Sequence, residues 1–294
     1  MVPRRAVEST MQGFFGTRVL RSGRGGLIFL LRALDFKVKI LYVVLATIET
    51  TTYTGKFGEK EDASMKIAGL QKLTLLDYPG KVACTVFASG CNFRCPFCHN
   101  AALVLPERKQ ADIPESDVIA FLRKRAGLLE GVCLSGGEPL LQQGIRAFLR
   151  RIKELGYFVK LDTNGSRPEL LGCLMEEGLL DYVAMDIKNT PSKYALIAGV
   201  PGMDTAPVIQ SAELLMCGRI PYEFRTTVVR EFHTRDDLVD IGRWLKGAQR
   251  YFLQGFVDSG DLIASGLHPA EPEELARAIQ LLKPFFNETA LRGV

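Results

Sequence analysis

Short apolar segments alternate with amphipathic segments along most of this chain, and the alternation constrains its fold more than any other feature. The apolar segments have the length of strands, and the segments between them have the apolar spacing of helices. The expected strands are residues 82–89, 131–135, 157–163, 181–188, 222–230 and 250–257, and the expected helices are residues 114–127, 140–155, 169–177, 207–217, 235–246 and 272–285. Six such β–α units predict an α/β fold with a parallel sheet and helices outside it, either open or barrel-shaped.

Unusual polar motifs follow the expected strands at the points where these strands end. CNFRCPFC follows the first strand, GGEP the second and DTNG the third, while Asp186 and Lys188 close the fourth and Arg225 lies within the fifth. In both kinds of parallel sheet the active site lies at the carboxyl ends of the strands, where the βα loops gather. The pattern therefore favours a curved sheet that brings these loops to one cavity.

The charge of the chain is concentrated at its beginning. The formal net charge is +4, and residues 1–64 contain ten Lys and Arg against six Asp and Glu, so the remaining residues carry 27 of each sign. A nucleic-acid-binding domain usually shows a Lys and Arg stripe along one face. With a neutral body, we expect no nucleic-acid partner.

The first 64 residues differ from the rest in character. Residues 27–48 are apolar but are interrupted by four charged residues, and the longest uninterrupted run, residues 40–48, is nine residues long. A spanning helix needs about 20 apolar residues, so we expect no membrane span. A secretory signal also fits poorly, because the apolar stretch starts far from Met1. We therefore expect a basic accessory extension over residues 1–64, a folded domain over residues 65–294 and a cytoplasmic location.

Three of the seven cysteines, Cys91, Cys95 and Cys98, are clustered in the string GCNFRCPFCHN. A dithiol couple would have no use for Cys91, a c-type haem requires export, and structural zinc usually has four ligands. Three cysteines without a partner pair suit a 4Fe–4S cluster in which one iron lacks a protein ligand. The string alone leaves these four chemistries open. The other cysteines lie in apolar surroundings and are expected to be buried thiols.

The cysteine string resembles the C-x3-C-x-φ-C signature of the radical S-adenosylmethionine (SAM) superfamily, with Phe97 at the aromatic position. The segment SGGEP over residues 135–139 strengthens the resemblance. It implies a partial (β/α)6 TIM-like barrel with a 4Fe–4S cluster on the three cysteines, and SAM chelating the open iron. The stretch LQKLTLLDYPGKVACTVFASGCNFRCPFCHN further resembles the start of glycyl-radical-enzyme activating proteins, particularly those of anaerobic ribonucleoside-triphosphate reductase. This similarity covers about residues 65–286.

The resemblance also implies roles for residues outside the cysteine string. Asp162 and Asp186 would line the cofactor site and share a monovalent cation with the SAM carboxylate, and Lys188 would help to position SAM. Simpler readings exist for each motif: an ordinary βα turn for GGEP, an Asx turn for DTNG and an exterior salt bridge for Arg225. The expected cofactor-binding residues are Phe97, Gly136, Gly137, Glu138, Asp162, Asn164, Asp186, Lys188, Arg225 and Gln254.

The implied activity is reductive cleavage of SAM to a 5′-deoxyadenosyl radical, which abstracts a hydrogen from a glycine of a partner glycyl radical enzyme under anaerobic conditions. A flavodoxin- or ferredoxin-type donor would supply the electron. The short segment between Cys98 and Ser135 has no additional cysteine set, which argues against activating enzymes with ferredoxin-like clusters there. The alternatives are a small-molecule radical enzyme similar to 7-carboxy-7-deazaguanine synthase, and a non-enzymatic iron–sulfur or zinc module.

Overall fold

The computed structural model describes residues 21–22, 26–27, 64–108, 111–258 and 260–293. The chain divides into two units, Met1–Phe57 and Gly58–Val294. In the first unit, β1 (Arg21–Ser22) and β2 (Gly26–Leu27) pair antiparallel. The predicted extension over residues 1–64 lies almost entirely outside the described residues and stays a prediction.

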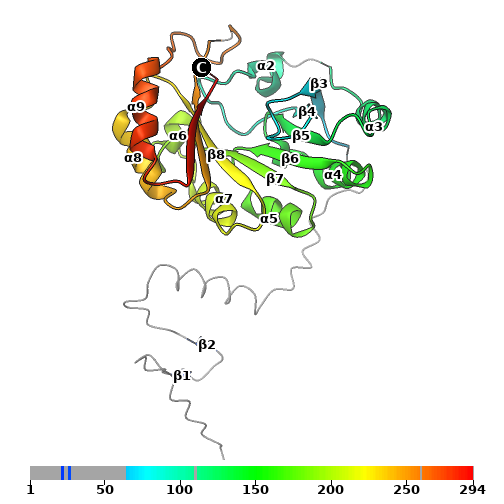
Figure 1. Ribbon diagram of the computed structural model, residues 1–294, viewed down its shortest axis with the longest axis horizontal. Helices are drawn as coiled ribbons and strands as arrows, with labels where there is room; N and C mark the ends of the chain where they lie inside the picture. Colours follow the sequence, from blue (N-terminus) through cyan, green and yellow to red (C-terminus); the bar gives the residue numbers. More distant parts are fainter. Residues whose placement is uncertain (1–20, 23–25, 28–63, 109–110, 259, 294) are drawn as a thin grey trace, which may run out of the picture. The chain divides into compact units, whose positions relative to one another are not determined.

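The described part of the second unit is built on one eight-stranded sheet with the order β10-β9-β8-β7-β6-β5-β4-β3. The strands from β4 to β10 run parallel, and β3 pairs antiparallel with β4. Figure 1 shows that the sheet is curved, with helices along its outer side. The strands are β3 (Ile67–Thr74), β4 (Ala83–Ala88), β5 (Gly131–Gly136), β6 (Phe158–Thr163), β7 (Tyr182–Asp186), β8 (Tyr222–Val228), β9 (Arg250–Gly255) and β10 (Glu288–Arg292).

The predicted α/β class and the six predicted strands, which are β4 to β9, are confirmed, and the two edge strands are additions. The main helices also match, except that the helix expected over residues 140–155 begins at Ile145, because Pro139 starts a separate 3₁₀ turn. The helices are α2 (Ala101–Val104), α3 (Glu115–Lys124), α4 (Ile145–Glu154), α5 (Pro168–Glu176), α6 (Tyr194–Ile197), α7 (Ala206–Met216), α8 (Arg235–Trp244) and α9 (Pro272–Leu282), with 3₁₀ turns at Pro106–Arg108 and Pro139–Leu141.

The central strands are buried on both faces, as expected for a parallel sheet that is covered by helices. Three consecutive residues of β5, Val132 to Leu134, have no exposed surface, and the same holds for Val183 to Met185 of β7. This continuous burial explains why the strands appear in the sequence as apolar runs rather than as alternating patterns. Among the described residues, no helix combines the length and apolar character needed to cross a bilayer.

Candidate functional site at the carboxyl ends of the strands

A cavity of about 220 Å³ opens at the carboxyl ends of the parallel strands. Of the thirteen residues predicted for the site, Glu138 is the one that does not line this cavity. The cavity lining also includes residues that were not predicted, namely Phe93, His99, Asn100, Val104, Ser135, Thr163 and Thr227. The structure thus brings the motifs at the ends of β4, β5, β6 and β7 to one place, together with Arg225 of β8 and Gln254 of β9.

The cysteine loop connects β4 to α2 and is held by backbone contacts. The N–H of Cys98 donates to the carbonyl of Cys95 at 3.0 Å, and the N–H of Arg94 donates to the carbonyl of Ala198 at 2.8 Å. The Arg94 guanidinium donates to the carbonyls of Cys91 and Phe93 at 2.6 and 2.8 Å. These bonds satisfy loop carbonyls inside the protein and leave the three cysteine side chains on the cavity wall.

The two glycines of GGEP are required by the close approach of two backbones. A Cβ on Gly137 would lie 1.9 Å from the carbonyl oxygen of Gly90, and a Cβ on Gly136 would lie 2.4 Å from the backbone nitrogen of Ala88. Gly136 also has a φ of +115°, which disfavours any residue with a Cβ. The N–H of Gly137 donates to the carbonyl of Ala88 at 2.9 Å. The end of β5 is therefore pressed directly against the cysteine loop.

Glu138 points away from the cavity and ties two loops together. Its fully buried carboxylate accepts from the N–H of Leu140 at 3.1 Å, from Thr163 Oγ1 at 2.8 Å and from the N–H of Asn164 at 2.7 Å. Burial raises the pKa of Glu138 to about 7, although the three donors oppose this shift. Glu138 therefore positions the DTNG loop and does not contact the cavity.

Asn164 of the DTNG loop faces the cysteine loop. Its Nδ2 donates to Asn92 Oδ1 at 2.9 Å and lies 3.8 Å from the sulfur of Cys91, while the N–H of Phe93 donates to the same sulfur at 3.3 Å. Hydrogen bonds to a cysteine sulfur stabilise its thiolate form and tune a metal centre bound to it.

Five charged side chains, from β6, β8 and the end of β7, form an ionic chain with alternating signs. Lys160 contacts Asp162, Asp162 lies 3.5 Å from Arg225, Arg225 donates to Asp186 at 2.9 Å, and Lys188 lies 3.2 Å from Asp186. Three positive and two negative groups leave one net positive charge. The ionic chain therefore suits a site that holds negative charge, such as cysteine thiolates.

The neighbouring charges decide the protonation states within the ionic chain. Burial alone would raise the pKa of Asp162 and Asp186, but the facing Arg225 and the two lysines hold both pKa values below the ordinary range. Burial alone would lower the pKa of Lys188, but the negative charge of Asp186 outweighs this effect, so the pKa of Lys188 is raised. All five groups are thus charged at neutral pH.

The segment after β9 lies over the cysteine loop. His99 Nε2 is 2.7 Å from the carbonyl of Val257, and the N–H of Ala264 donates to the carbonyl of Pro96 at 2.9 Å. Asp261 of this segment pairs with Arg108 at 2.9 Å. His99 therefore connects the cysteine loop to this segment.

Two residues behind the cavity were missed by the sequence analysis. Lys160 is 1% exposed and forms the inner end of the ionic chain, and His233 is buried with its Nε2 donating to the carbonyl of Lys188 at 2.8 Å. Lys160 could have been identified from the sequence. It lies two residues before Asp162 in an otherwise apolar strand, so the two side chains face the same side of the sheet. Nothing local marked His233.

The family model described as the radical SAM superfamily matches residues 85–245, which is more than half of the chain and includes the cysteine loop and the GGEP and DTNG motifs. This chain belongs to the radical SAM superfamily. The expectation drawn from the cysteine string and SGGEP is therefore confirmed, and membership implies a 4Fe–4S cluster and SAM as cofactors.

Curated relatives and solved structures agree with membership of the radical SAM superfamily. A protein of Methanocaldococcus jannaschii, named "Putative glycyl-radical enzyme activating enzyme", is 30% identical over 235 residues, which cover 78% of this chain and 96% of that protein. A 7-carboxy-7-deazaguanine synthase of Koribacter versatilis is 35% identical over 158 residues, which cover 52% of this chain and 65% of that protein. The structure of Streptococcus suis SuiB bound to precursor peptide SuiA has a TM-score of 0.57 at 14% identity, covering 70% of this chain and about half (48%) of that one, and supports the fold alone.

The three cysteine sulfurs in the cavity are a donor set that fits a radical SAM cluster. The three cysteines are free thiols, and burial raises the pKa of Cys91 to about 12 and that of Cys95 to about 11, so only a bound cation would hold them as thiolates. Among the described residues, no three His, Cys, Asp or Glu side chains are already placed to hold a single metal ion. The cavity volume of about 220 Å³ lies below the roughly 300–1,000 Å³ of typical ligand sites.

Proposed function

We propose that this radical SAM protein is an activating enzyme that generates a radical on a glycine of a partner glycyl radical enzyme, as in the anaerobic ribonucleotide reductase system. The observation that carries the proposal is the match to the Methanocaldococcus protein, because it extends over 96% of that protein's length. Partial matches support shared chemistry, whereas a match over a whole relative also supports a shared type of substrate.

Within this proposal Cys91, Cys95 and Cys98 would hold the cluster. A bound cluster would supply the one electron needed for cleavage of SAM to methionine and a 5′-deoxyadenosyl radical. The residues of this chain hold SAM in place and keep water and other hydrogen donors away from the radical. An electron is used in each cleavage, so we propose a flavodoxin- or ferredoxin-type donor in the cytoplasm.

The residues around the proposed cluster provide complementary groups for SAM. The amino group of SAM would meet backbone carbonyls of Gly136 and Gly137, and its carboxylate would meet the positive end of the ionic chain at Lys188. Asp162 and Asp186 would then face the positive sulfonium side and would share a monovalent cation with the SAM carboxylate. Phe97, Asn164 and Gln254 would complete the wall around cofactor and cluster. The net positive charge of the ionic chain supports this arrangement.

The test is anaerobic reconstitution of the full-length protein with iron and sulfide, followed by reduction with dithionite in the presence of SAM. We expect a brown protein that produces 5′-deoxyadenosine. Replacing any cluster cysteine, for example Cys91→Ala, should abolish both the colour and the product, whereas Cys173→Ala on α5 should change neither. A colourless zinc-loaded protein, or a Cys91→Ala variant with full activity, would contradict the assignment.

The partner is tested separately by paramagnetic resonance. The reduced protein is mixed with SAM and a candidate glycyl radical enzyme from the same genome, and a glycyl radical doublet is expected on the partner. The control partner carries Ala at its radical glycine. Production of 5′-deoxyadenosine without a doublet for any candidate would refute the activating function while leaving the radical SAM chemistry in place.

A second candidate function is a reaction on a small molecule, of the 7-carboxy-7-deazaguanine synthase type. The observation that favours it is the 35% identity with the Koribacter protein over 158 residues. Its lower coverage of 65% makes it the second choice. Turnover of a pterin substrate with SAM, followed by mass spectrometry, separates it from the activating function.

A further inference from the structure

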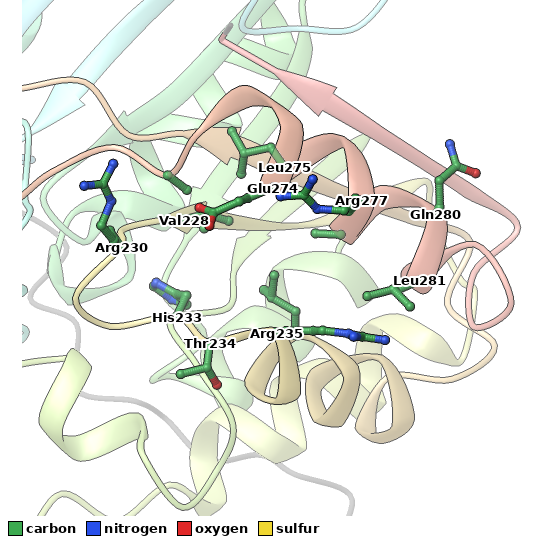
Figure 2. Close-up of a pocket in the computed structure, with 13 residues that line it drawn as sticks. Val228, Arg230, His233, Thr234, Arg235, Glu274, Leu275, Arg277, Gln280 and Leu281 are labelled. Carbon is green, nitrogen blue, oxygen red and sulfur yellow. The ribbon is translucent and has the colours of Figure 1, made fainter.

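A second pocket, of about 680 Å³, lies on the other side of β8 and is larger than the cofactor cavity. Figure 2 shows α8 on one side of this pocket and α9 on the other. Successive residues of a strand point to opposite faces, and Thr227 lines the cavity at the cysteines while Val228 lines this pocket. The outer pocket, as we call it, is therefore separate from the cofactor cavity.

The floor of the outer pocket is made of alkyl side chains. Val228, Leu238, Leu275 and Ala278 are all nearly buried, and Leu281 closes one side. Such a surface offers a favourable contact of about 25 cal/mol per Å² to an apolar group that covers it. Water in the pocket can make few hydrogen bonds with these side chains. The floor thus favours a ligand with a hydrocarbon body.

The polar groups of the outer pocket leave two guanidiniums unpaired. Arg235 at the start of α8 and Arg277 on α9 have no ion pair within the described part of the chain, and both are exposed. By contrast, Arg230 is paired with Glu271 at 2.5 Å, and Glu274 caps α9 by accepting from the N–H of Glu271 at 3.3 Å. Figure 2 places Arg235 and Arg277 on the two facing helices.

The remaining polar groups on the wall are occupied by the protein itself. His233 accepts from the N–H of Val229 at 3.1 Å through Nδ1 and donates to the carbonyl of Lys188 at 2.8 Å through Nε2, and burial lowers its pKa, so it is neutral. Thr234 Oγ1 is used in the capping box of α8 with Asp237. The free donors toward a ligand are therefore those of Arg235 and Arg277, together with the amide of Gln280.

We propose that the outer pocket binds an amphipathic organic anion, with its hydrocarbon body on the alkyl floor and a carboxylate or phosphate group between Arg235 and Arg277. A volume of about 680 Å³ lies within the roughly 300–1,000 Å³ of small-molecule sites. Guanidinium groups bind carboxylates and phosphates through paired N–H donors, which favours such a head group over a neutral polar one. This site goes beyond the proposed function and does not depend on it.

The experiment measures binding to the reconstituted full-length protein by isothermal titration calorimetry, without turnover. The probes are decanoate, decyl phosphate and decanol, all below their aggregation concentrations. We expect saturable one-to-one binding of at least one anion, and binding at least tenfold weaker for decanol. The stronger of the two anions identifies the head group as carboxylate or phosphate.

Two variants and one matched control locate the binding site. The Arg235→Gln/Arg277→Gln double variant should weaken binding of the anion at least tenfold, because both positions are exposed and the fold tolerates the change. Leu281→Asp should also weaken it, and a thermal melt checks that this variant is folded. Arg123→Gln/Lys124→Gln on α3 removes the same charge elsewhere and should have no effect. Unchanged affinity in the Arg235→Gln/Arg277→Gln variant, or equal affinity for decanol, would overturn the proposal.

Discussion

Replacing Lys160 by Met tests whether the ionic chain is a single energetic unit. Lys160 is 1% exposed and contacts Asp162, whose side chain is 14% exposed. Methionine has nearly the same length, so it fills the space but removes the charge. Removing one partner of a buried ion pair costs about 3–5 kcal/mol, because the other charge stays buried. In the variant, Asp162 still has Arg225 as a partner at 3.5 Å. We therefore expect a loss of stability at the lower end of this range, about 3 kcal/mol.

This loss is large enough to measure by thermal unfolding of the apoprotein under reducing conditions. For a domain of this size, 1 kcal/mol corresponds to roughly 2–4 °C in Tm, so the Lys160→Met variant should melt about 6–12 °C below the parent protein. The parent and the variant are compared at pH 7, where all members of the ionic chain are charged.

The Lys160→Met/Asp162→Asn double variant provides the control. Because it removes both charges, it should be more stable than the Lys160→Met variant. The double-mutant cycle, which also uses the Asp162→Asn variant, should give a coupling energy of at least about 2 kcal/mol between the two residues. Additive effects of the two substitutions, or a drop of less than 2 °C for Lys160→Met, would show that the contact contributes nothing and would refute the reasoning.

Three further predictions concern the loops around the cavity. Gly137→Ala should destabilise the protein by more than about 3 kcal/mol in thermal melts and prevent cluster loading, since the added Cβ would lie 1.9 Å from the carbonyl oxygen of Gly90. The control is Gly172→Ala on α5, whose added Cβ would have its nearest atom at 3.5 Å. This variant should be slightly more stable than the parent protein. Glu138 has a folded-state pKa raised to about 7, so its contribution to stability falls as pH rises from about 4.5 to 7, and Glu138→Gln should flatten this part of the stability profile. Arg225→Lys should cost about 2–3 kcal/mol in urea unfolding, because one ammonium cannot replace a fork that contacts both Asp162 and Asp186; a cost below 0.5 kcal/mol would contradict this.

The central strands could be predicted from the sequence because they are buried on both faces and appear as apolar runs. The edge strand β3 has exposed residues over Gln71 to Leu73, so its sequence lacks such a run, and β10 is only five residues long with no fully buried residue. Their position in the sheet depends on pairing with β4 and β9, which no local pattern reveals. Edge strands are thus where a sequence analysis of this kind fails.

The position of the site could also be predicted, but not the direction of each side chain. The motifs gather because the carboxyl ends of parallel strands share one edge. Glu138, however, belongs to the same motif as Gly137 and points the other way, into hydrogen bonds with Thr163 and Asn164. A motif specifies a place in the fold, and the neighbouring donors then decide which way a carboxylate turns.

The burial of the ionic chain is itself an argument for function. A buried ion pair is rarely more stable than well-packed apolar side chains of the same volume, since desolvation offsets the attraction. Five charges on β6, β7, β8 and the residues just after β7 meet next to the three cysteines; Lys160 is buried, and the other four are partly buried and line the cavity. Lys160 does not line it, and its contact with Asp162 keeps that carboxylate charged and fixed while Arg225 bridges to Asp186. Stability alone does not explain this arrangement, whereas clustered charges of this kind are typical of functional sites.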